Sequence, residues 1–314
     1  MHPAYSVIFF TWVSGTGYGL IIFAGFFSPF ERALQDSFTG LVIIFISLVL
    51  ITVGLFSSMF HLGHPERAWR ALSQWRSSWL SREGLLAIAT YIPALVFGYG
   101  WGIVGCLDGL WAAAALITSL SATATLYTTA MIYRSLTPIP AWNTNLTVVN
   151  YLLLGPMTGG LWLAAILRIL DQPNGHIETA VSLVLIAALM SKLRYWQVIA
   201  KNAFVVRSAS AIGLDKGTIR SVEWPHTEQN YVLKEMGYRV GRKHSQILRR
   251  LTIALAFVVP LVSFAAAHSL FGWTSTVLVL VAAISGSMGV LVERWLFFAE
   301  ANHTVSTYYY MDSM

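Results

Sequence analysis

Residues 38–60 read FTGLVIIFISLVLITVGLFSSMF, a run of 23 residues without one ionisable side chain. About 20 apolar residues are enough for a helix to cross the hydrocarbon core of a bilayer. The run is uniformly apolar, whereas the strands of a membrane barrel show short segments of alternating polarity. It therefore predicts a transmembrane helix and decides the fold class.

Seven further runs of this kind follow or precede it. Hydrophobic residues make up 56% of the sequence and charged residues 11%, whereas a typical soluble domain has about 25% charged residues. We expect an all-α integral membrane protein with eight transmembrane helices in one polytopic domain, residues 1–314. The predicted spans are Tyr5–Phe27, Phe38–Phe60, Leu85–Leu107, Gly109–Tyr133, Leu146–Leu170, His176–Trp196, Leu251–Phe271 and Thr274–Phe298.

Two spans carry features that bear on packing. In the first, Gly15 and Gly19 are four residues apart, a spacing that lets a neighbouring helix approach closely. The sixth is the least regular, because Lys192 and Arg194 fall inside it and would have to extend to the membrane interface.

The distribution of positive charge predicts the orientation. Eight crossings place both termini on one side, together with the second, fourth and sixth connections. That side holds 18 of the 20 Lys and Arg residues, and the other holds Arg32 and Arg168. Positive loops mark the cytoplasmic side. We therefore expect both termini to lie in the cytoplasm. Positive charge beside the membrane also explains the basic net charge, so no binding to nucleic acid is expected.

One extended hydrophilic segment, residues 200–250, separates the sixth and seventh spans. It mixes aromatic and charged residues, which suits an ordered cytoplasmic lobe better than a disordered linker. Two interpretations stay open. The lobe is either a solvated loop with a short surface helix or a docking surface for a soluble subunit, since Trp, Tyr and Arg commonly anchor interfaces.

The polar residues of most chemical interest follow the run quoted above. Phe60-His61-Leu62-Gly63-His64-Pro65-Glu66-Arg67 leads, through a loop with Trp and Arg residues, to Trp79-Leu80-Ser81-Arg82-Glu83-Gly84. Ionisable groups at the ends of membrane helices are a functional hypothesis by default. An imidazole, a carboxylate and a guanidinium around an apolar cleft can bind a quinone, because they hydrogen-bond its oxygens and exchange its protons.

Each of these residues also has a structural interpretation. His61 can cap the end of the second helix. Glu83 lies in the predicted first turn of the third helix, where the helix dipole stabilises a carboxylate. Arg67 and Arg82 can extend towards lipid phosphates. We favour the functional interpretation because these residues share one membrane face between consecutive helices.

Metal and haem sites are not expected in this protein. The single cysteine, Cys106, excludes a cysteine-ligated cluster or zinc site of its own. His61 and His268 lie at opposite membrane faces and cannot ligate one haem iron together. A His176–His268 pair on the outer side is geometrically conceivable, but no spacing signature supports it.

Several stretches carry a resemblance to a known family. The sequence is similar to the membrane-anchor subunits of dimethyl sulfoxide reductase-type molybdoenzymes (the DmsC family), and within them to the anchors of cytoplasmic sulfite dehydrogenase complexes (SoeC-like). The similarity spans nearly the whole sequence, and the spacing from His61 to Glu83 is its most specific part. The stretches are His2-Pro3-Ala4-Tyr5-Ser6-Val7-Ile8-Phe9-Phe10 with Gly15, Gly17 and Gly19; Phe60–Gly63 with Pro65 and Arg67; Leu80–Glu83; Glu228–Tyr231; and Met236–Arg239.

The resemblance implies an eight-helix anchor without a redox centre of its own. Its partners would be a molybdopterin catalytic subunit and an iron–sulfur subunit with four clusters, the latter docked over a site for ubiquinone or menaquinone. In the family, the positions matching His61, Arg67 and Glu83 belong to quinol binding and proton transfer. We add Arg82 and His64 as candidate quinone-binding residues, although some relatives have a non-titratable residue at the position of His64.

The sequence thus predicts the quinone-binding subunit of a three-subunit oxidoreductase. Cytoplasmic orientation favours sulfite oxidation coupled to quinone reduction. The alternative is reverse flow, in which quinol oxidation feeds an S- or N-oxide reductase. A more distant alternative is a secondary transporter with polar residues on broken helices; Pro156 beside Gly155 and Gly159 is the only such feature, and it also fits a packing kink.

Overall fold

The computed structural model describes residues 5–31, 34, 36–60, 62–202, 213 and 244–304, and all regular elements in these ranges are helical. Eight helical segments of this described part are long and apolar enough to cross a membrane. The elements are α1 (Tyr5–Phe27), α2 (Ser37–Met59), η2 (Pro65–Gln74), α3 (Trp79–Tyr99), η3 (Gly100–Val104), α4 (Leu110–Arg134), α5 (Asn145–Ile169), α6 (Gly175–Asn202), α10 (Ser245–Ile253), η4 (Ala254–Val258), α11 (Val259–His268) and α12 (Trp273–Ala299).

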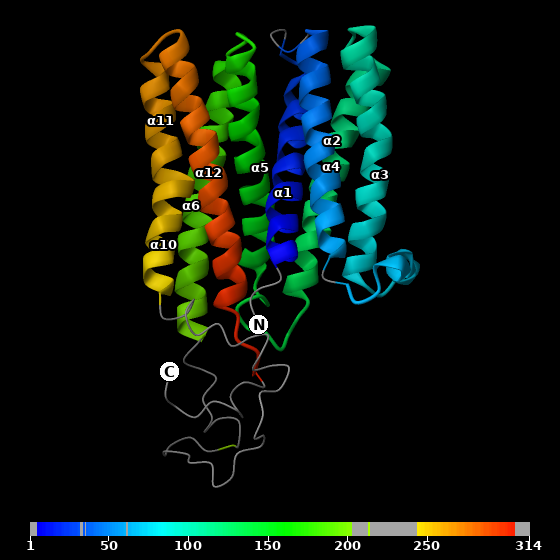
Figure 1. Ribbon diagram of the computed structural model, residues 1–314, viewed down its shortest axis with the longest axis vertical. Coiled ribbons are helices and arrows are strands. Elements are labelled where there is room, and N and C mark those ends of the chain that lie inside the picture. Colours follow the sequence, from blue (N-terminus) through cyan, green and yellow to red (C-terminus); the bar gives the residue numbers. More distant parts are fainter. Residues whose placement is uncertain are drawn as a thin grey trace.

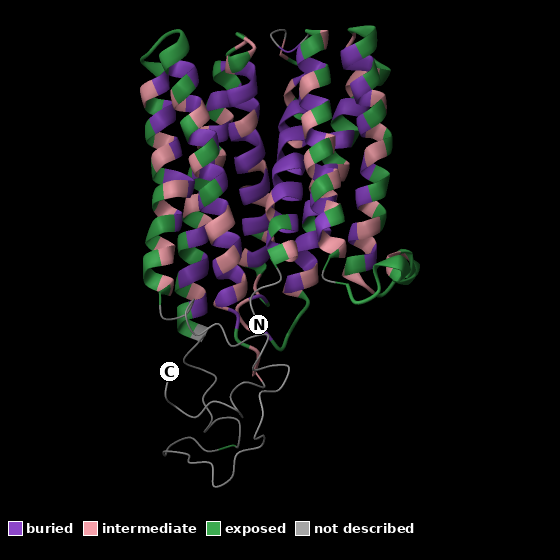
Figure 2. Ribbon diagram, viewed as in Figure 1, coloured by how far each residue is buried: buried purple, intermediate pink, exposed green. Residues whose placement is uncertain are grey.

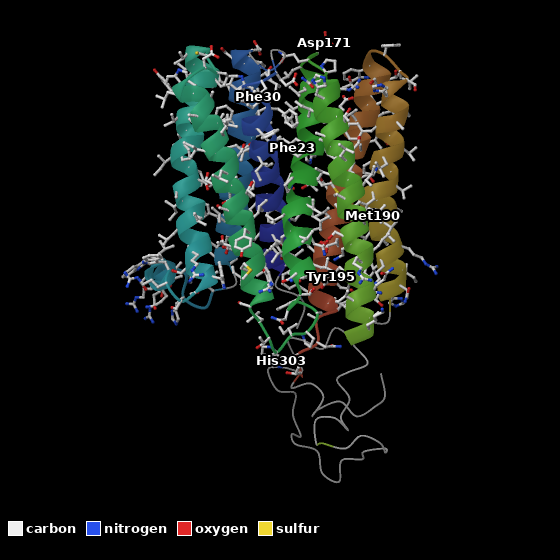
Figure 3. The ribbon with its side chains drawn as sticks, turned by 180° about the vertical axis from the view of Figure 1, so that it is seen from behind. Phe23, Phe30, Asp171, Met190, Tyr195 and His303 are labelled. Atoms are coloured by element: carbon white, nitrogen blue, oxygen red, sulfur yellow. The ribbon has the colours of Figure 1, made fainter. Side chains whose placement is uncertain are left out.

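The spanning helices stand side by side in one bundle (Figure 1). Asp171 and Phe30 mark one end of it, the Asp171 end, and His303 marks the opposite end, the His303 end (Figure 3). The segments α10, η4 and α11 form a single span, and η3 extends α3. The η2 segment lies at the His303 end, beside the lower end of α3 (Figure 1).

The distribution of buried and exposed side chains is that of a helix bundle in a lipid bilayer. Buried residues line the helix contacts, while exposed ones cover the outer faces (Figure 2). Many exposed side chains are large and apolar, such as Phe45, Ile92 and Leu120, each more than two thirds exposed. An apolar outer surface of this kind is stable against lipid rather than water. The helices α1 and α5 are the most buried spans and form the centre of the bundle.

The contact between α1 and α5 depends on glycine. A Cβ atom on Gly19 would lie 2.0 Å from the carbonyl oxygen of Gly155, and one on Gly159 would lie 2.0 Å from the backbone nitrogen of Leu20. The close approach expected of the first span is thereby confirmed. Pro156 lies inside a continuous α5, next to this crossing. It serves packing here, which removes the one feature that favoured a transporter.

The predicted spans are all confirmed. The third and seventh end three residues earlier than predicted, at Val104 and His268, and three other ends differ by six residues. The third helix begins at Trp79 rather than Leu85, the sixth continues to Asn202, and the seventh begins at Ser245 rather than Leu251. In each case the additional turns carry charged or amphipathic residues. Hydropathy locates the apolar part of a helix, whereas the hydrogen-bonded helix continues into the interface.

Lys192 corrects an expectation. Its side chain is 1% exposed and forms an ion pair with Glu293 of α12, so it does not extend to the interface. Arg194, two residues on, is exposed as expected. Arg294, counted above among the juxtamembrane charges, is also buried. Most of the 200–250 segment lies outside the described residues, as do Met1–Ala4 and residues 305–314.

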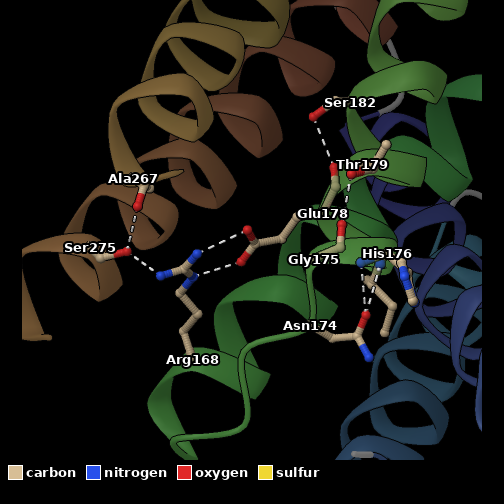
Figure 4. Close-up of polar contacts among 10 residues, drawn as sticks. Arg168, Asn174, Gly175, His176, Glu178, Thr179, Ser182, Ala267 and Ser275 are labelled. Carbon is tan, nitrogen blue, oxygen red and sulfur yellow. Dashed lines mark hydrogen bonds and ion pairs between the residues drawn. The ribbon is translucent and has the colours of Figure 1, made fainter. Parts of the chain in front are cut away.

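At the Asp171 end, one buried ion pair connects several helices (Figure 4). Arg168 of α5 holds Glu178 of α6 through two hydrogen bonds, Nε–Oε1 at 2.6 Å and Nη2–Oε2 at 2.9 Å. The guanidinium also donates to Ser275 of α12, and Ser275 donates to the carbonyl of Ala267 in α11 at 3.0 Å. A bidentate Arg–carboxylate pair fixes geometry as well as charge. These contacts join α5, α6, α11 and α12 at the Asp171 end.

Candidate functional site

The loop before α3 presents an exposed, positively charged surface at the His303 end. His64 Nδ1 lies 3.0 Å from Glu66 Oε1, and Arg67 Nε lies 3.7 Å from the same atom. All three side chains are more than half exposed. His61, the residue at the start of this loop, lies outside the described residues.

Arg82 is directed at the loop. Its Nε donates to the carbonyl oxygen of Trp75 at 2.8 Å and its Nη2 to that of Arg76 at 2.6 Å. The guanidinium also stacks over the ring of Trp79 at 4.3 Å. Consecutive helix residues do not face each other, so Arg82 holds the loop while Glu83 points elsewhere.

Glu83 lies inside the bundle. It is 4% exposed, and the Thr129 hydroxyl of α4 donates to its Oε1 at 2.5 Å. The helix dipole acts most strongly in the first turn of a helix. Because α3 begins at Trp79, Glu83 lies beyond that turn, and the dipole does not account for its position. A carboxyl group buried in apolar surroundings is costly unless it is hydrogen-bonded or functional.

Several other hydroxyl groups of α1, α2 and α3 are buried or partly buried. Tyr18 of α1 is 2% exposed and has no hydrogen-bond partner for its hydroxyl among the described residues. The buried Ser81 hydroxyl is likewise unpartnered in this part of the protein. Tyr91 shares a 2.7 Å hydrogen bond with Thr52 of α2. The carboxyl group and these hydroxyls can donate and accept hydrogen bonds at an otherwise apolar place.

The predicted residues are thus only partly brought together. Arg67 pairs with Glu66 and Glu83 with Thr129, and no ion pair joins Arg67 to Glu83 within the described ranges. Sequence reasoning also missed Thr129 and Tyr18. The sequence does contain a signal for Thr129. In the fourth span, Thr118, Thr125 and Thr129 recur at helical spacing and therefore share one face of the helix.

Glu293 was missed as well. It follows a long apolar run in the last span, and with Arg294 it places two charges within a membrane helix. Lys192 supplies the counter-charge from α6. A search for charged residues inside several spans would have suggested that they pair.

Comparison with known proteins agrees with this architecture. Residues 1–299 match the family described as DMSO reductase anchor subunit (DmsC). The sequence is 32% identical to the C subunit of the sulfite dehydrogenase of Allochromatium vinosum, over 98% of this protein and 99% of the relative. It is 28% identical to the C subunit of the anaerobic dimethyl sulfoxide reductase of Haemophilus influenzae, over 55% of this protein and 60% of the relative. The protein belongs to the family of DMSO reductase membrane-anchor subunits.

Proposed function

We propose that this protein is the quinone-reactive subunit of a three-subunit complex, with a molybdopterin catalytic subunit and a four-cluster iron–sulfur subunit as partners. The observation that carries the proposal is the buried Glu83 carboxyl group with its hydrogen bond from Thr129. The buried hydroxyls of Tyr18 and Ser81, which have no partner among the described residues, offer further hydrogen bonds. These groups fit a quinone, which needs hydrogen-bond partners for its oxygens and an apolar place for its ring.

The chemistry assigned to this subunit is binding and proton transfer. A bound quinone supplies the two-electron redox chemistry, with the electrons exchanged through the clusters of the iron–sulfur subunit. Glu83 holds and releases a proton at its carboxyl oxygen, and Thr129 orients that group. His61 offers a second titratable hydrogen-bond partner at the start of the loop. Arg67, Arg82 and His64 lie at the His303 end, where the iron–sulfur subunit would dock.

Sulfite oxidation with quinone reduction is the favoured direction. It is supported by similarity over nearly full length to a subunit of a sulfite dehydrogenase. The alternative, quinol oxidation by the anchor of an S- or N-oxide reductase, is supported by the shorter match to a subunit of a dimethyl sulfoxide reductase. Both directions use the same proton-exchanging groups.

The quinone site is tested by His61→Ala and Glu83→Gln in the purified complex. Loss of one proton-transfer group lowers a rate by about 10²–10⁴, so quinone-linked turnover should be abolished. Activity with an artificial soluble electron carrier, which reaches the clusters directly, should survive. Asp108→Asn is the matched control, since it makes the same carboxylate-to-amide change on an exposed residue in the connection between η3 and α4. Intact quinone turnover in both test variants would contradict the proposal.

The orientation is tested separately. We propose that the termini and the His303 end face the cytoplasm of a bacterial inner membrane. Of the 20 Lys and Arg residues, 18 fall on that side by the predicted spans, and 16 remain when the buried Lys192 and Arg294 are left out. A reporter fused after Met314 should be active only if it functions in the cytoplasm. A reporter active only in the periplasm would overturn the orientation.

Docking of the partner has its own test. The loop around Arg67 and the 200–250 lobe belong to the same predicted side, so both should contact the iron–sulfur subunit. Charge reversal at Arg239 and Arg242, which lie outside the described residues, should weaken recovery of the complex at moderate salt. If the variant complex is recovered as well as the wild type, even in high salt, the lobe is a solvated loop and not a docking surface.

A further inference from the structure

Three ionisable side chains that the proposed function does not use lie between α5, α6 and α12. Lys192 pairs with Glu293, and Arg294 Nε lies 3.6 Å from the other carboxylate oxygen of Glu293. Each of these side chains is 3% exposed or less. Burying charges at such places is costly, and ionisable residues within a membrane bundle usually mark transfer paths or binding sites.

Several polar atoms of this cluster make no hydrogen bond among the described residues. Glu293 Oε2 and Arg294 Nε and Nη1 have no hydrogen-bond partner among the described residues. The Arg294 guanidinium lies 3.8 Å from the ring centre of Tyr151, whose buried hydroxyl is also unpartnered in that part of the protein. A purely structural ion pair is expected to satisfy its buried polar atoms. A group that gives and accepts protons needs such free positions.

Charged and polar residues connect this cluster to the His303 end. Glu300 follows Glu293 by two helical turns, hence on the same face of α12 and about 10 Å along its axis. Glu300 Oε1 accepts from Arg249 Nε of α10 at 2.7 Å. The rings of Tyr195 and Trp196 of α6 complete the surroundings. Lys192 Nζ lies 4.2 Å and 5.2 Å from their centres, and Arg249 stacks over Trp196 at 5.6 Å.

Two tyrosines, one on α5 and one on α4, lie on the helices between the cluster and α3, the helix of Glu83. The ring of Tyr151 stacks on that of Tyr133 of α4 at 5.5 Å. Tyr133 lies one helical turn after Thr129, the hydrogen-bond donor to Glu83. Side chains with exchangeable protons therefore lie on α12, α5 and α4, and α5 contacts both of the other two helices.

We propose that Glu293 is a proton-exchanging residue that passes protons between the His303 end and Glu83 by way of the Tyr151 and Tyr133 hydroxyls. The inference rests on the proposed function of Glu83. An iron–sulfur subunit docked over the loop would cover the direct route from the aqueous face to Glu83. A lateral route through α12 and α5 begins beside Glu300 and remains available.

Each transfer conserves atoms and charge. When Glu83 releases its proton to the substrate oxygen, its carboxylate takes one proton through Tyr133 and Tyr151 from Glu293, which is protonated only for that transfer. The Glu293 carboxylate that remains is stabilised by Lys192 and Arg294 until it takes a proton from water at the His303 end. Only O–H bonds break and form, and the same steps run backwards for quinol oxidation.

The test uses Glu293→Gln and Tyr151→Phe in the purified complex. Both should lower quinone-linked turnover about tenfold or more and leave activity with an artificial soluble carrier unchanged. Tyr151→Phe keeps the ring under Arg294 and removes only the hydroxyl. Tyr195→Phe is its matched control, because the Tyr195 hydroxyl is already engaged in a hydrogen bond to the carbonyl of Ala141 at 3.0 Å. It should leave both activities unchanged.

A second readout does not depend on turnover. Infrared difference spectra between two pH values should contain a buried carboxyl band that Glu293→Gln removes and Tyr195→Phe retains. The double variant Lys192→Met/Glu293→Gln removes both charges of this pair, so that Lys192 is not left unpaired and the net charge of the cluster with Arg294 is unchanged. It should assemble but stay slow with quinone.

The outcomes separate the two proposals. Restored quinone turnover in the double variant would make the cluster a structural ion pair and overturn the inference. Loss of quinone turnover in Glu83→Gln, with full turnover in both Glu293→Gln and Tyr151→Phe, would remove the lateral path and leave the proposed function standing. Full quinone turnover in Glu83→Gln would instead refute the proposed function itself.

Discussion

The Thr129 hydroxyl lies between two acceptors, 2.5 Å from Glu83 Oε1 and 3.0 Å from the carbonyl oxygen of Thr125. A hydroxyl has one proton to donate and lone pairs to accept with. When Glu83 is charged, Thr129 can donate to it. When Glu83 is protonated, it can donate to Thr129, which then donates to Thr125. Thr129 thus supports both protonation states of Glu83 with one rotation of its hydroxyl.

Replacing this hydroxyl tests its role. Thr129→Val keeps the branched shape and removes the hydrogen bond, so quinone-linked turnover should fall about tenfold, less than in Glu83→Gln. Steady-state rates with quinone and with an artificial carrier measure the effect. Thr123→Val is the control, because the Thr123 hydroxyl donates to the Ser119 carbonyl of its own helix. An equal loss in both threonine variants would assign the effect to α4 as a whole.

The crossing of α1 and α5 predicts a stability effect. Gly19→Ala would place a Cβ atom 2.0 Å from a backbone oxygen of Gly155, and neither backbone can move without separating the helices. We expect a loss of about 1–3 kcal/mol or more, seen as a lower unfolding temperature in detergent. Gly175→Ala, where a Cβ meets nothing within 4 Å, should be neutral. A Gly19→Ala protein as stable as the wild type would show that this contact tolerates separation.

Sequence reasoning located the spans well, because hydrophobic length is a local property that lipid enforces on each helix separately. It was wrong about Lys192, whose partner Glu293 is 101 positions away on another helix. It found Glu83 through its spacing from His61, but not Thr129, since the α3–α4 register decides which threonine meets the carboxyl group. Pairing between helices depends on rotation about each helix axis. Composition does not record that rotation.

The ion pair of Arg168 and Glu178 offers a test at the end of the bundle remote from Glu83. Glu178→Gln leaves Arg168, 13% exposed, without its counter-charge, and removing one partner of a buried pair costs about 3–5 kcal/mol. The unfolding temperature should fall clearly. Arg168→Met/Glu178→Leu removes both charges and should recover most of that loss. Quinone turnover per folded complex should stay unchanged, and a selective loss of it would connect the Asp171 end to the chemistry.

Glu31, in the connection between α1 and α2, predicts a pH dependence of stability. The Asn174 amide donates to its Oε2 at 3.0 Å, and His176 Nδ1 lies 2.8 Å from its Oε1. These hydrogen bonds, that from Asn174 first, lower the pKa of Glu31 from its ordinary value of 4.5. The charged form is therefore favoured by folding, so its contribution is present above pH 4.5 and is lost as the pH falls through the lowered pKa. Glu31→Gln should unfold at a lower temperature than the wild type at pH 7, with a difference that shrinks below about pH 4. A difference that grows on acidification would mean that the neutral carboxyl group, rather than the carboxylate, binds Asn174.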